Sequence, residues 1–255
     1  MNNSLTRISS LTFVFIFFPF MFLCGQNSPE LDSITETGED LLSLGEYKEA
    51  EKRFDEVLEE DEDFIPALEG KIKTRIEREK FSRAKRTISD AIENHPEHAY
   101  FYLYDGQLKI KRERYDEAIQ AFNKALRLVE EGEDKKLRSK IYVYRGAASQ
   151  HKKDYEKAEA DYTKALELNE RNPNVLTYRG SLYYNREEFD EALEDFNRVL
   201  ELDPNNHYAQ YNIGMSYFKQ NKKHEACDAF HKACELGNRN ACKMVVSKCL
   251  RERNK

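Results

Sequence analysis

The 255-residue sequence lacks tryptophan and contains only ten glycines and six prolines. Glycine and proline are the residues that most disfavour helices, so their scarcity is typical of a helical protein. The sequence also has no glycine-rich phosphate loop, no nucleophile elbow and no His-Glu-x-x-His pattern. We therefore predict a protein that is not an enzyme and that needs no cofactor.

Charge is abundant but nearly balanced, with 35% charged residues and a formal net charge of −6. A mildly negative chain argues against a nucleic-acid partner, because the phosphate backbone repels it. The histidines do not indicate a metal site. His95 and His98 flank a proline, and His224 and His231 lie two helical turns apart. Neither pair has further ligands at a useful spacing, so no metal is expected.

A unit of 34 residues recurs along the chain, and its clearest copy runs from Pro173 to Asn206. An alanine column repeats at this interval, with one step of 40 residues: Ala50, Ala84, Ala118, Ala158, Ala192 and Ala226. Four residues after each alanine stands a large side chain: Phe54, Ile88, Phe122, Tyr162, Phe196 and Phe230. Twelve residues before each alanine the column reads Gly38, Ile72, Gly106, Gly146, Gly180 and Gly214. Agreement in several columns identifies six copies of one structural unit.

Each unit is predicted to be two helices of about 12 to 15 residues joined by a short turn. The glycine and alanine columns mark the closest approach of the two helices, since only small side chains let the axes draw together. The aromatic column fills the seam between neighbours. One helix pair cannot bury its apolar face alone, so the copies must stack.

These columns resemble the tetratricopeptide repeat over about residues 31–237. The resemblance implies an all-α, right-handed superhelical solenoid of six helix pairs followed by a capping helix at 239–251. The expected repeats are 31–64, 65–98, 99–138 with an insertion, 139–172, 173–206 and 207–237. Ile72 replaces the small residue of its column, so we expect its helix pair to be splayed. The six extra residues within 129–138 are expected to lengthen the second helix of the third repeat and the turn after it.

Residues 1–25 lie outside the repeats. Arg7 precedes an apolar run from Leu11 to Cys24, which is short for a membrane span and is interrupted by Pro19. This pattern predicts a signal peptide and export to the periplasm, the cell envelope or the medium. An uncleaved membrane anchor is one alternative. A second is a lipoprotein modified at Cys24, although the large Leu23 before it does not fit such a site.

Four cysteines follow the predicted signal, and an even number in an exported chain indicates disulfides. Cys227 and Cys234 lie two turns apart on one helix, about 10 Å along its axis, which is beyond disulfide reach. The same holds for Cys242 and Cys249. A turn at Gly237–Asn238 would make an antiparallel hairpin in which Cys234 faces Cys242 and Cys227 faces Cys249. We therefore predict the bridges Cys227–Cys249 and Cys234–Cys242.

The same four cysteines do not suit a zinc ion, because two pairs about 10 Å apart cannot surround one ion at sulfur distances of about 2.3 Å. No Cys-x-x-Cys motif indicates a redox-active pair. The segment from Lys232 to Cys242 also resembles exported, cysteine-rich relatives of this repeat, in which adjacent helices are joined by disulfides.

The resemblance further implies that the first helix of each pair lines a concave groove. In the fourth repeat the corresponding positions are Lys140, Val143, Ala147 and Gln150. In the fifth and sixth repeats they are Asn174, Thr177, Ser181 and Tyr184, and Tyr208, Tyr211, Met215 and Phe218. The sixth set is apolar enough for a peptide-binding hot spot, unless the capping helix covers it as ordinary core. The Lys/Asn clamp of chaperone adaptors is not reproduced at the family's positions.

The predicted function is that of a non-enzymatic scaffold of the cell envelope, which binds a peptide or protein partner in the concave groove. Two alternatives remain. One is a structural accessory subunit of an envelope complex that uses its convex face. The other is a module that binds glycan or peptidoglycan through its tyrosine-rich surface.

Overall fold

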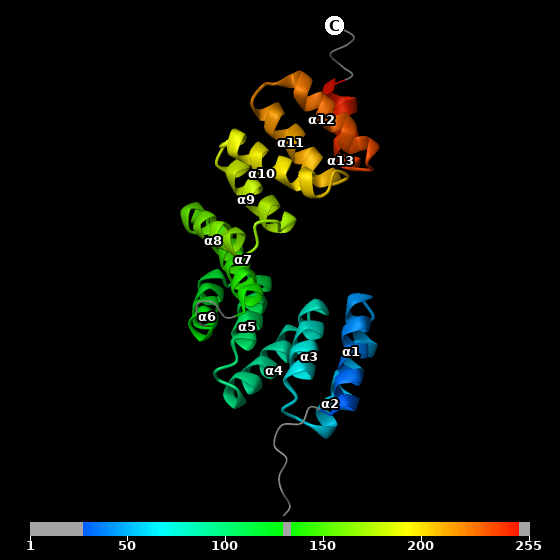
Figure 1. Cartoon of the computed structure of the whole chain (residues 1–255), viewed down its shortest axis with the longest axis vertical. Coiled ribbons are helices and arrows are strands. Elements are labelled where there is room, and N and C mark those ends of the chain that lie inside the picture. Colours follow the sequence, from blue (N-terminus) through cyan, green and yellow to red (C-terminus); the bar gives the residue numbers. More distant parts are fainter. Residues whose placement is uncertain (1–27, 130–133, 250–255) are drawn as a thin grey trace, which may run out of the picture.

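The computed structural model describes residues 28–129 and 134–249. Within these ranges the chain is entirely helical, with α-helices in successive antiparallel pairs and a short π-helix at the end (Figure 1). The first three pairs are α1 (Pro29–Ser43) with α2 (Tyr47–Glu60), α3 (Ile65–Glu77) with α4 (Phe81–Asn94), and α5 (Ala99–Lys111) with α6 (Tyr115–Leu128). The next three are α7 (Lys135–His151) with α8 (Tyr155–Leu168), α9 (Pro173–Asn185) with α10 (Phe189–Leu202), and α11 (His207–Lys219) with α12 (Lys223–Glu235). The chain ends in α13 (Arg239–Met244) and the π-helix η1 (Val245–Cys249).

The seam inside most pairs is closed by a glycine of the first helix and an aromatic ring of the second. A Cβ atom added to Gly106 would lie 2.3 Å from Cε1 of Phe122, and one added to Gly180 would lie 2.9 Å from Cε1 of Phe196. Both rings are fully buried. The glycine column is therefore required because the ring of the partner helix occupies the space that a side chain would need.

The second repeat departs from this arrangement, as its sequence predicts. Ile72 and Ile88 take the places of the glycine and the aromatic ring, and both are buried. The contact between α3 and α4 is the least extensive of any pair within a repeat. A branched side chain on both helices holds their axes farther apart than a glycine does.

The insertion extends a different helix from the one expected. Helix α6 ends at Leu128 and has 14 residues, the same length as α8 and α10, so the expected lengthening of the third repeat's second helix is wrong. Instead α7, the first helix of the fourth repeat, has 17 residues. The Asp134 carboxylate accepts a hydrogen bond from the backbone N–H of Leu137 at 2.9 Å and thereby caps the early start of this helix.

The turn between the two helices of each pair repeats one backbone conformation. Its last-but-one residue has a positive φ in every repeat: Gly45, Glu79, Glu113, Lys153, Glu187 and Asn221. The left-handed region costs a residue with a side chain roughly 1–2 kcal/mol relative to glycine. Only the first repeat places glycine there, so the other five turns carry strain that the packing of the two helices offsets.

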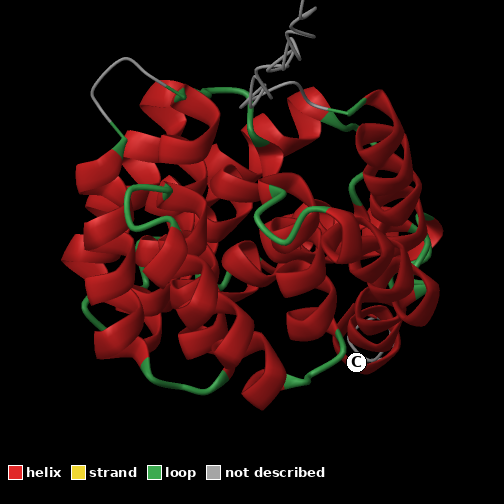
Figure 2. Ribbon diagram, turned by 90° about the horizontal axis from the view of Figure 1, so that it is seen from below, coloured by secondary structure: helices red, strands yellow, loops and turns green. Residues whose placement is uncertain are grey.

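The first helices of neighbouring repeats contact one another along the whole chain, in addition to contacting their own partners. In the described part of the chain, the second helices of neighbouring repeats make no comparable contacts. The first helices α1, α3, α5, α7, α9 and α11 therefore lie on the inner, concave side of the superhelix, and the second helices lie outside. Figures 1 and 2 show the course of this superhelix from the side and from below. The buried apolar residues form a series of clusters that follow the repeats rather than one central core. The architecture is the predicted right-handed solenoid of paired helices.

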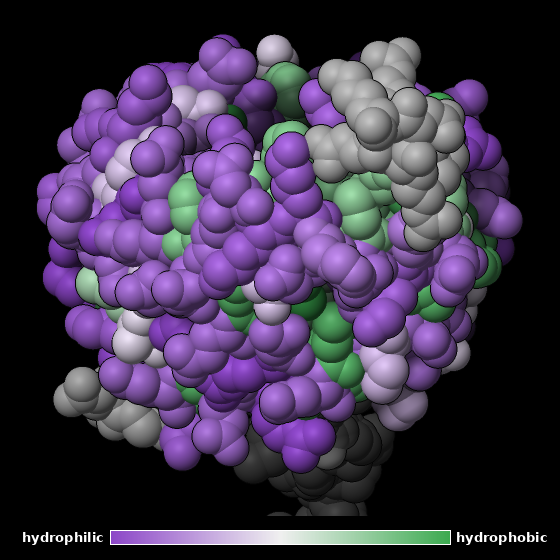
Figure 3. Space-filling model, turned by 90° about the horizontal axis from the view of Figure 1, so that it is seen from above, coloured by the Kyte–Doolittle hydropathy of each residue, from purple (hydrophilic) through white to green (hydrophobic). Residues whose placement is uncertain are grey.

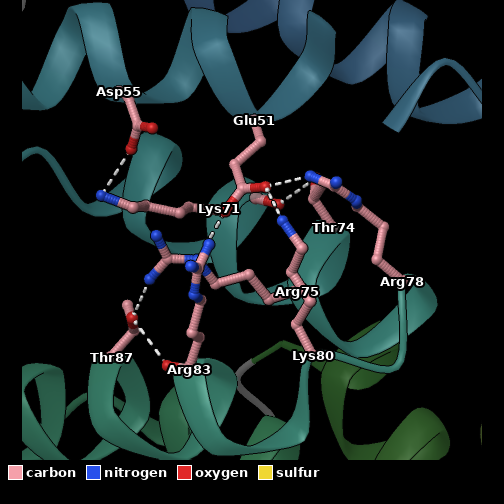
Figure 4. A network of polar contacts seen from close by, with 10 residues as sticks. Glu51, Asp55, Lys71, Thr74, Arg75, Arg78, Lys80, Arg83 and Thr87 are labelled. Atoms are coloured by element: carbon pink, nitrogen blue, oxygen red, sulfur yellow. Dashed lines mark hydrogen bonds and ion pairs between the residues drawn. The ribbon is translucent and has the colours of Figure 1, made fainter. Parts of the chain in front are cut away.

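A buried carboxylate links the first two repeats on the outer side. Glu51 of α2 accepts hydrogen bonds from Arg75 Nε at 2.9 Å and Lys80 Nζ at 3.1 Å, and it also pairs with Arg78 (Figure 4). Three cations thus converge on one carboxylate between α2 and the α3–α4 hairpin. Burial by itself would raise the pKa of Glu51, but the hydrogen bonds from Arg75 and Lys80 outweigh it, so the pKa lies below its usual value.

Two disulfides close the C-terminal end. Cys227 of α12 is joined to Cys249 of η1, with their Cα atoms 5.7 Å apart, and Cys234 of α12 is joined to Cys242 of α13, at 4.7 Å. These are the pairs predicted from the hairpin geometry. Asn238 caps α13 by accepting a hydrogen bond from the N–H of Ala241. The expected capping helix is therefore α13 continued by η1, and residues 250 and 251 of that prediction lie outside the described residues.

Candidate functional site

A pocket of about 620 Å³ lies on the concave side, between α7 and α9. Its floor and walls combine three kinds of side chain. The apolar and aromatic ones are Val143, Tyr144, Ala147, Leu168, Val175 and Tyr178. The polar neutral ones are Ser139, Asn169, Asn172 and Asn174, and the charged ones are Lys135, Lys136 and Lys140. We call this cavity the α7–α9 pocket.

The described lining of the α7–α9 pocket carries positive charge and contains no acidic residue. Within residues 28–129 and 134–249, Lys135, Lys136 and Lys140 form no ion pair or hydrogen bond through their side chains. Some lysines of other first helices are paired: the Lys71 ammonium lies 2.6 Å from the Asp55 carboxylate, and that of Lys109 lies 2.6 Å from the Asp105 carboxylate. The pocket is therefore a local positive site on an acidic protein.

Lys140 is the most enclosed of the three lysines. It is half-buried, whereas Lys135 and Lys136 are exposed. Burial lowers the pKa of Lys140, and repulsion from Lys73 lowers it further. A charged amine held in this way gains stability from any anion that approaches it.

The extra length of α7 brings these lysines to the pocket. Because α7 begins at Lys135, its first turn projects beyond the usual start of a first helix. Lys136 and Lys140 are four residues apart and so lie on the same face of α7. Both also line a second pocket, of about 360 Å³, which extends over α1, α3 and α5. The two pockets are therefore neighbours along one concave surface.

The second pocket has a different charge pattern. It contains Lys73, which donates a hydrogen bond to Glu39 at 2.9 Å, and Glu69, which accepts one from the Tyr104 hydroxyl at 2.7 Å. Burial raises the pKa of Tyr104 strongly, and the neighbouring Glu69 adds to the effect, so its hydroxyl stays protonated and donates. These polar groups satisfy one another, unlike the lysines of the α7–α9 pocket.

The aromatic residues of the α7–α9 pocket are held by rings beneath them. Tyr144 stacks on Phe122 at 6.2 Å between centroids, and Tyr178 stacks on Tyr162 at 6.1 Å. Tyr178 nevertheless keeps 46% of its surface exposed. Both rings therefore present a rigid apolar face to the concave surface, which is a property of peptide-binding sites.

The structure brings together four of the seven residues proposed for the groove from the sequence. Ser181, Tyr184, Tyr211 and Met215 line a separate pocket of about 240 Å³ between α9 and α11. Tyr211 and Met215 also pack against the terminal cluster that includes Val245. The cap thus covers these side chains in part and leaves a small cavity beside them.

The other three proposed residues lie apart from this small pocket. Phe218 packs against the terminal cluster, with the Lys248 ammonium 5.8 Å from its ring centroid. Tyr208 is 66% exposed and lies against the His207 ring. The Thr177 hydroxyl donates to the carbonyl of Pro173, one turn earlier in its own helix. The seven residues therefore do not form one surface.

Four residues assigned to the groove by the family's register do line the α7–α9 pocket: Lys140, Val143, Ala147 and Asn174. The register does not predict the further lining residues Lys135, Lys136, Tyr144 and Tyr178. The two lysines lie upstream of the register because the insertion extends α7. The signal that could have found them is the spacing of Lys136 and Lys140 at i and i+4, which puts two cations on one helix face.

Neither a metal centre nor a membrane span is present in the described part of the chain. No group of three or more His, Cys, Asp or Glu side chains there is arranged to hold a metal ion. Within residues 28–129 and 134–249, none of the helices has both the length and the apolar character needed to cross a membrane. The predicted signal peptide and Cys24 lie outside the described residues. The visible part of the face seen from above is mainly hydrophilic, with apolar side chains in narrow patches (Figure 3).

Stacked antiparallel helix pairs, most of them closed by a seam of glycine against a ring, define an α-solenoid of helix–turn–helix repeats. Comparison with known families gives the class more narrowly. Tetratricopeptide repeat models match residues 70–133, 102–171, 173–206 and 208–236. The chain belongs to the tetratricopeptide repeat family. No curated protein sequence matches it.

Solved structures agree with this fold. Pseudomonas aeruginosa pilF is 18% identical, with a TM-score of 0.70, and the match covers 86% of this chain and 97% of that one. YrrB, described as a TPR protein with an unusual peptide-binding site, is 24% identical, with a TM-score of 0.57 over 74% of this chain and 94% of its own. MamA is 21% identical, with a TM-score of 0.58 over 67% of this chain and 96% of its own. At these identities the likeness shows the fold alone.

Proposed function

We propose that this protein is a non-enzymatic scaffold that binds a peptide segment of a partner protein in the α7–α9 pocket. The observation that carries the proposal is the pocket itself: about 620 Å³ on the concave side, with an aromatic and apolar floor and polar side chains around it. Such a combination of apolar floor and few polar groups is typical of binding sites. Proteins with tetratricopeptide repeats are generally interaction scaffolds, and the peptide-binding description of YrrB supports the same role.

The pocket can be tested by selecting peptides from a random library on the purified protein. The blocking variant is Ala147→Phe, because Ala147 lines the pocket and a phenyl group there fills the cavity without changing charge. The matched control is Ala160→Phe, the same change at an exposed position on the outer helix α8. We expect selected peptides to bind the wild type and the control but not the blocked variant. Peptides that bind all three equally would place binding outside this pocket.

We also propose that the protein acts in the cell envelope. Residues 1–25 have the pattern of a signal peptide, and disulfides such as those of α12 persist in oxidising compartments. Mass spectrometry of the native N-terminus tests this: a chain that starts near residue 26 indicates a cleaved signal, and a lipid on Cys24 indicates the lipoprotein alternative. An intact Met1 on a cytoplasmic protein would contradict export.

A further inference from the structure

We propose that the α7–α9 pocket is specific for an acidic peptide segment, whose Asp or Glu side chains pair with Lys136 and Lys140 while its apolar side chains pack on Val143, Tyr144 and Tyr178. This inference rests on the proposed function, because it names the chemistry of the ligand in the same pocket. In this proposal the pocket lysines bind the carboxylates of Asp or Glu side chains, not the C-terminal carboxylate of the peptide.

Charge complementarity favours an acidic ligand. Three lysines line the pocket and, among the described residues, no Asp or Glu side chain does, although the whole chain has a net charge of −6. Lys136 and Lys140 form no direct ion pair with a described residue, and Glu69 and Glu39 attract Lys140 only at longer range. Two ammonium groups on one helix face repel each other, and a carboxylate between them removes that repulsion.

Neutral hydrogen-bond donors lie beside the lysines. The carboxamide oxygen of Asn172 caps α9 by accepting from the N–H groups of Asn174 and Val175, at 3.1 and 3.4 Å. Its amide N–H donors have no partner within residues 28–129 and 134–249. Asn169 and Asn174 line the same pocket, and their side chains also have no partner among the described residues. Amide donors beside ammonium groups complete the hydrogen bonds that a carboxylate accepts.

The neighbouring pocket, over α1, α3 and α5, suits carboxylates less well. Its lining includes Glu39 and Glu69 beside its lysines, whereas the described lining of the α7–α9 pocket has lysines and no acidic residue. The α7–α9 pocket is therefore the favoured place for the acidic side chains. The aromatic rings of Tyr144 and Tyr178 require apolar side chains in the same short stretch, so a purely acidic run fits less well than one with interspersed apolar residues.

The experiment extends the library selection and measures the dissociation constants of the recovered peptides by fluorescence polarisation. The test variant is Lys136→Gln/Lys140→Gln, which removes two charges and keeps side chains of similar length. The matched control is Lys48→Gln/Lys85→Gln, which removes two exposed charges from the outer helices α2 and α4. Lys136→Gln alone serves as a second variant, since Lys136 is exposed and its replacement is expected to leave the fold intact.

We expect recovered peptides to be enriched in Asp and Glu, and their binding to weaken about tenfold or more for each pocket lysine that is replaced. The control should bind like the wild type, and amidation of the peptide C-terminus should make no difference. Loss of binding on amidation would show that the lysines bind the C-terminal carboxylate of the peptide, and it would overturn the inference.

Three further outcomes separate this inference from the proposed function. Peptides that Ala147→Phe blocks, but that show no acidic enrichment and bind the double variant equally, overturn this inference and leave the pocket as the binding site. Peptides that Ala147→Phe does not affect overturn both proposals, as does recovery of no peptide at all. Equal competition by a single-stranded oligonucleotide of the same charge would show unspecific attraction of anions and overturn the inference.

Discussion

Arg179 and Asp195 form a two-pronged ion pair across the seam between α9 and α10. The Arg179 Nε and Nη2 atoms donate to the two carboxylate oxygens of Asp195, each at 2.8 Å, and Asp195 is only 1% exposed. The pair recurs one repeat earlier between Arg145 and Asp161, at 2.8 and 2.6 Å. In both repeats the remaining guanidinium nitrogen donates to the outer helix of the preceding repeat. Each arginine therefore ties three helices together and helps to set the angle between two repeats.

Asp195→Asn keeps the shape of the side chain but removes its charge, which leaves the Arg179 guanidinium without an anion. We expect the free energy of unfolding to fall by about 3 kcal/mol, because breaking one partner of a buried pair leaves an uncompensated charge. Denaturation in urea measures this. The control is Asp154→Asn, which breaks the exposed pair between Asp154 and Lys157 and should change little. If both substitutions lower the free energy of unfolding equally, the buried pair contributes no more stability than the exposed pair.

Gly106→Ala tests the seam of the third repeat. The added methyl group would lie 2.3 Å from Phe122, whose ring is fully buried and packed on all sides. We expect a loss of about 2–3 kcal/mol from overpacking. Gly45→Ala measures backbone strain without overpacking: nothing lies within 4 Å of the added Cβ, and its φ of +78° predicts a smaller loss of about 1 kcal/mol. Partial rescue of Gly106→Ala by Phe122→Leu, measured by thermal unfolding, would confirm that the ring is the obstacle.

Glu113→Gly should stabilise the protein, although most substitutions do the reverse. Glu113 has a φ of 58° in the turn between α5 and α6, and glycine adopts that conformation without strain. The relief of strain exceeds the entropy that glycine adds to the unfolded chain, so we expect a gain of about 0.5 kcal/mol. Glu194→Gly, at an exposed site inside α10, should instead lose about 1 kcal/mol. A loss at both sites in the same urea titration would contradict the role assigned to the turn.

Glu51 makes the stability depend on pH. The pKa of Glu51 in the folded protein lies below its unfolded value of about 4.5, so its ionised form stabilises the fold fully above about pH 4.5. That contribution is lost as the pH falls through the lower folded pKa. We therefore expect the wild type to lose more stability than Glu51→Gln between pH 7 and pH 3. The urea midpoints at the two pH values measure this. An equal loss of stability in both proteins would mean that other carboxylates cause the acid sensitivity.

Much of the fold was predictable because the constraints are local or periodic. Most repeats have a glycine twelve residues before an alanine and an aromatic ring four residues after that alanine. This spacing describes the seam between the two helices directly, and its repetition implies that the helix pairs stack. The disulfides were predictable for a related reason. Once Gly237–Asn238 is a turn between two straight helices, the distance of each cysteine from the turn decides which ones face each other.

The candidate site was predictable only in part. Val143, Ala147 and Lys140 were placed on the concave side by their position in the repeat, and they do line the α7–α9 pocket. The position of the insertion was not predictable, since six additional residues can extend either adjoining helix without breaking the periodicity. The left-handed turn at Glu113 was equally hidden, because glutamate gives no signal for a positive φ.

The sequence by itself determined the repeat, the number of helix pairs and the pairing of the cysteines, since each depends on spacing along a regular helix. The tertiary structure decided where the first turn of α7 projects, and so brought Lys136 and Lys140 to a pocket with an aromatic floor. It also decided that the cap partly covers Phe218 and Tyr211. These outcomes depend on how neighbouring repeats are rotated against each other. That rotation results from the packing of many side chains at once, and no single column of the repeat records it.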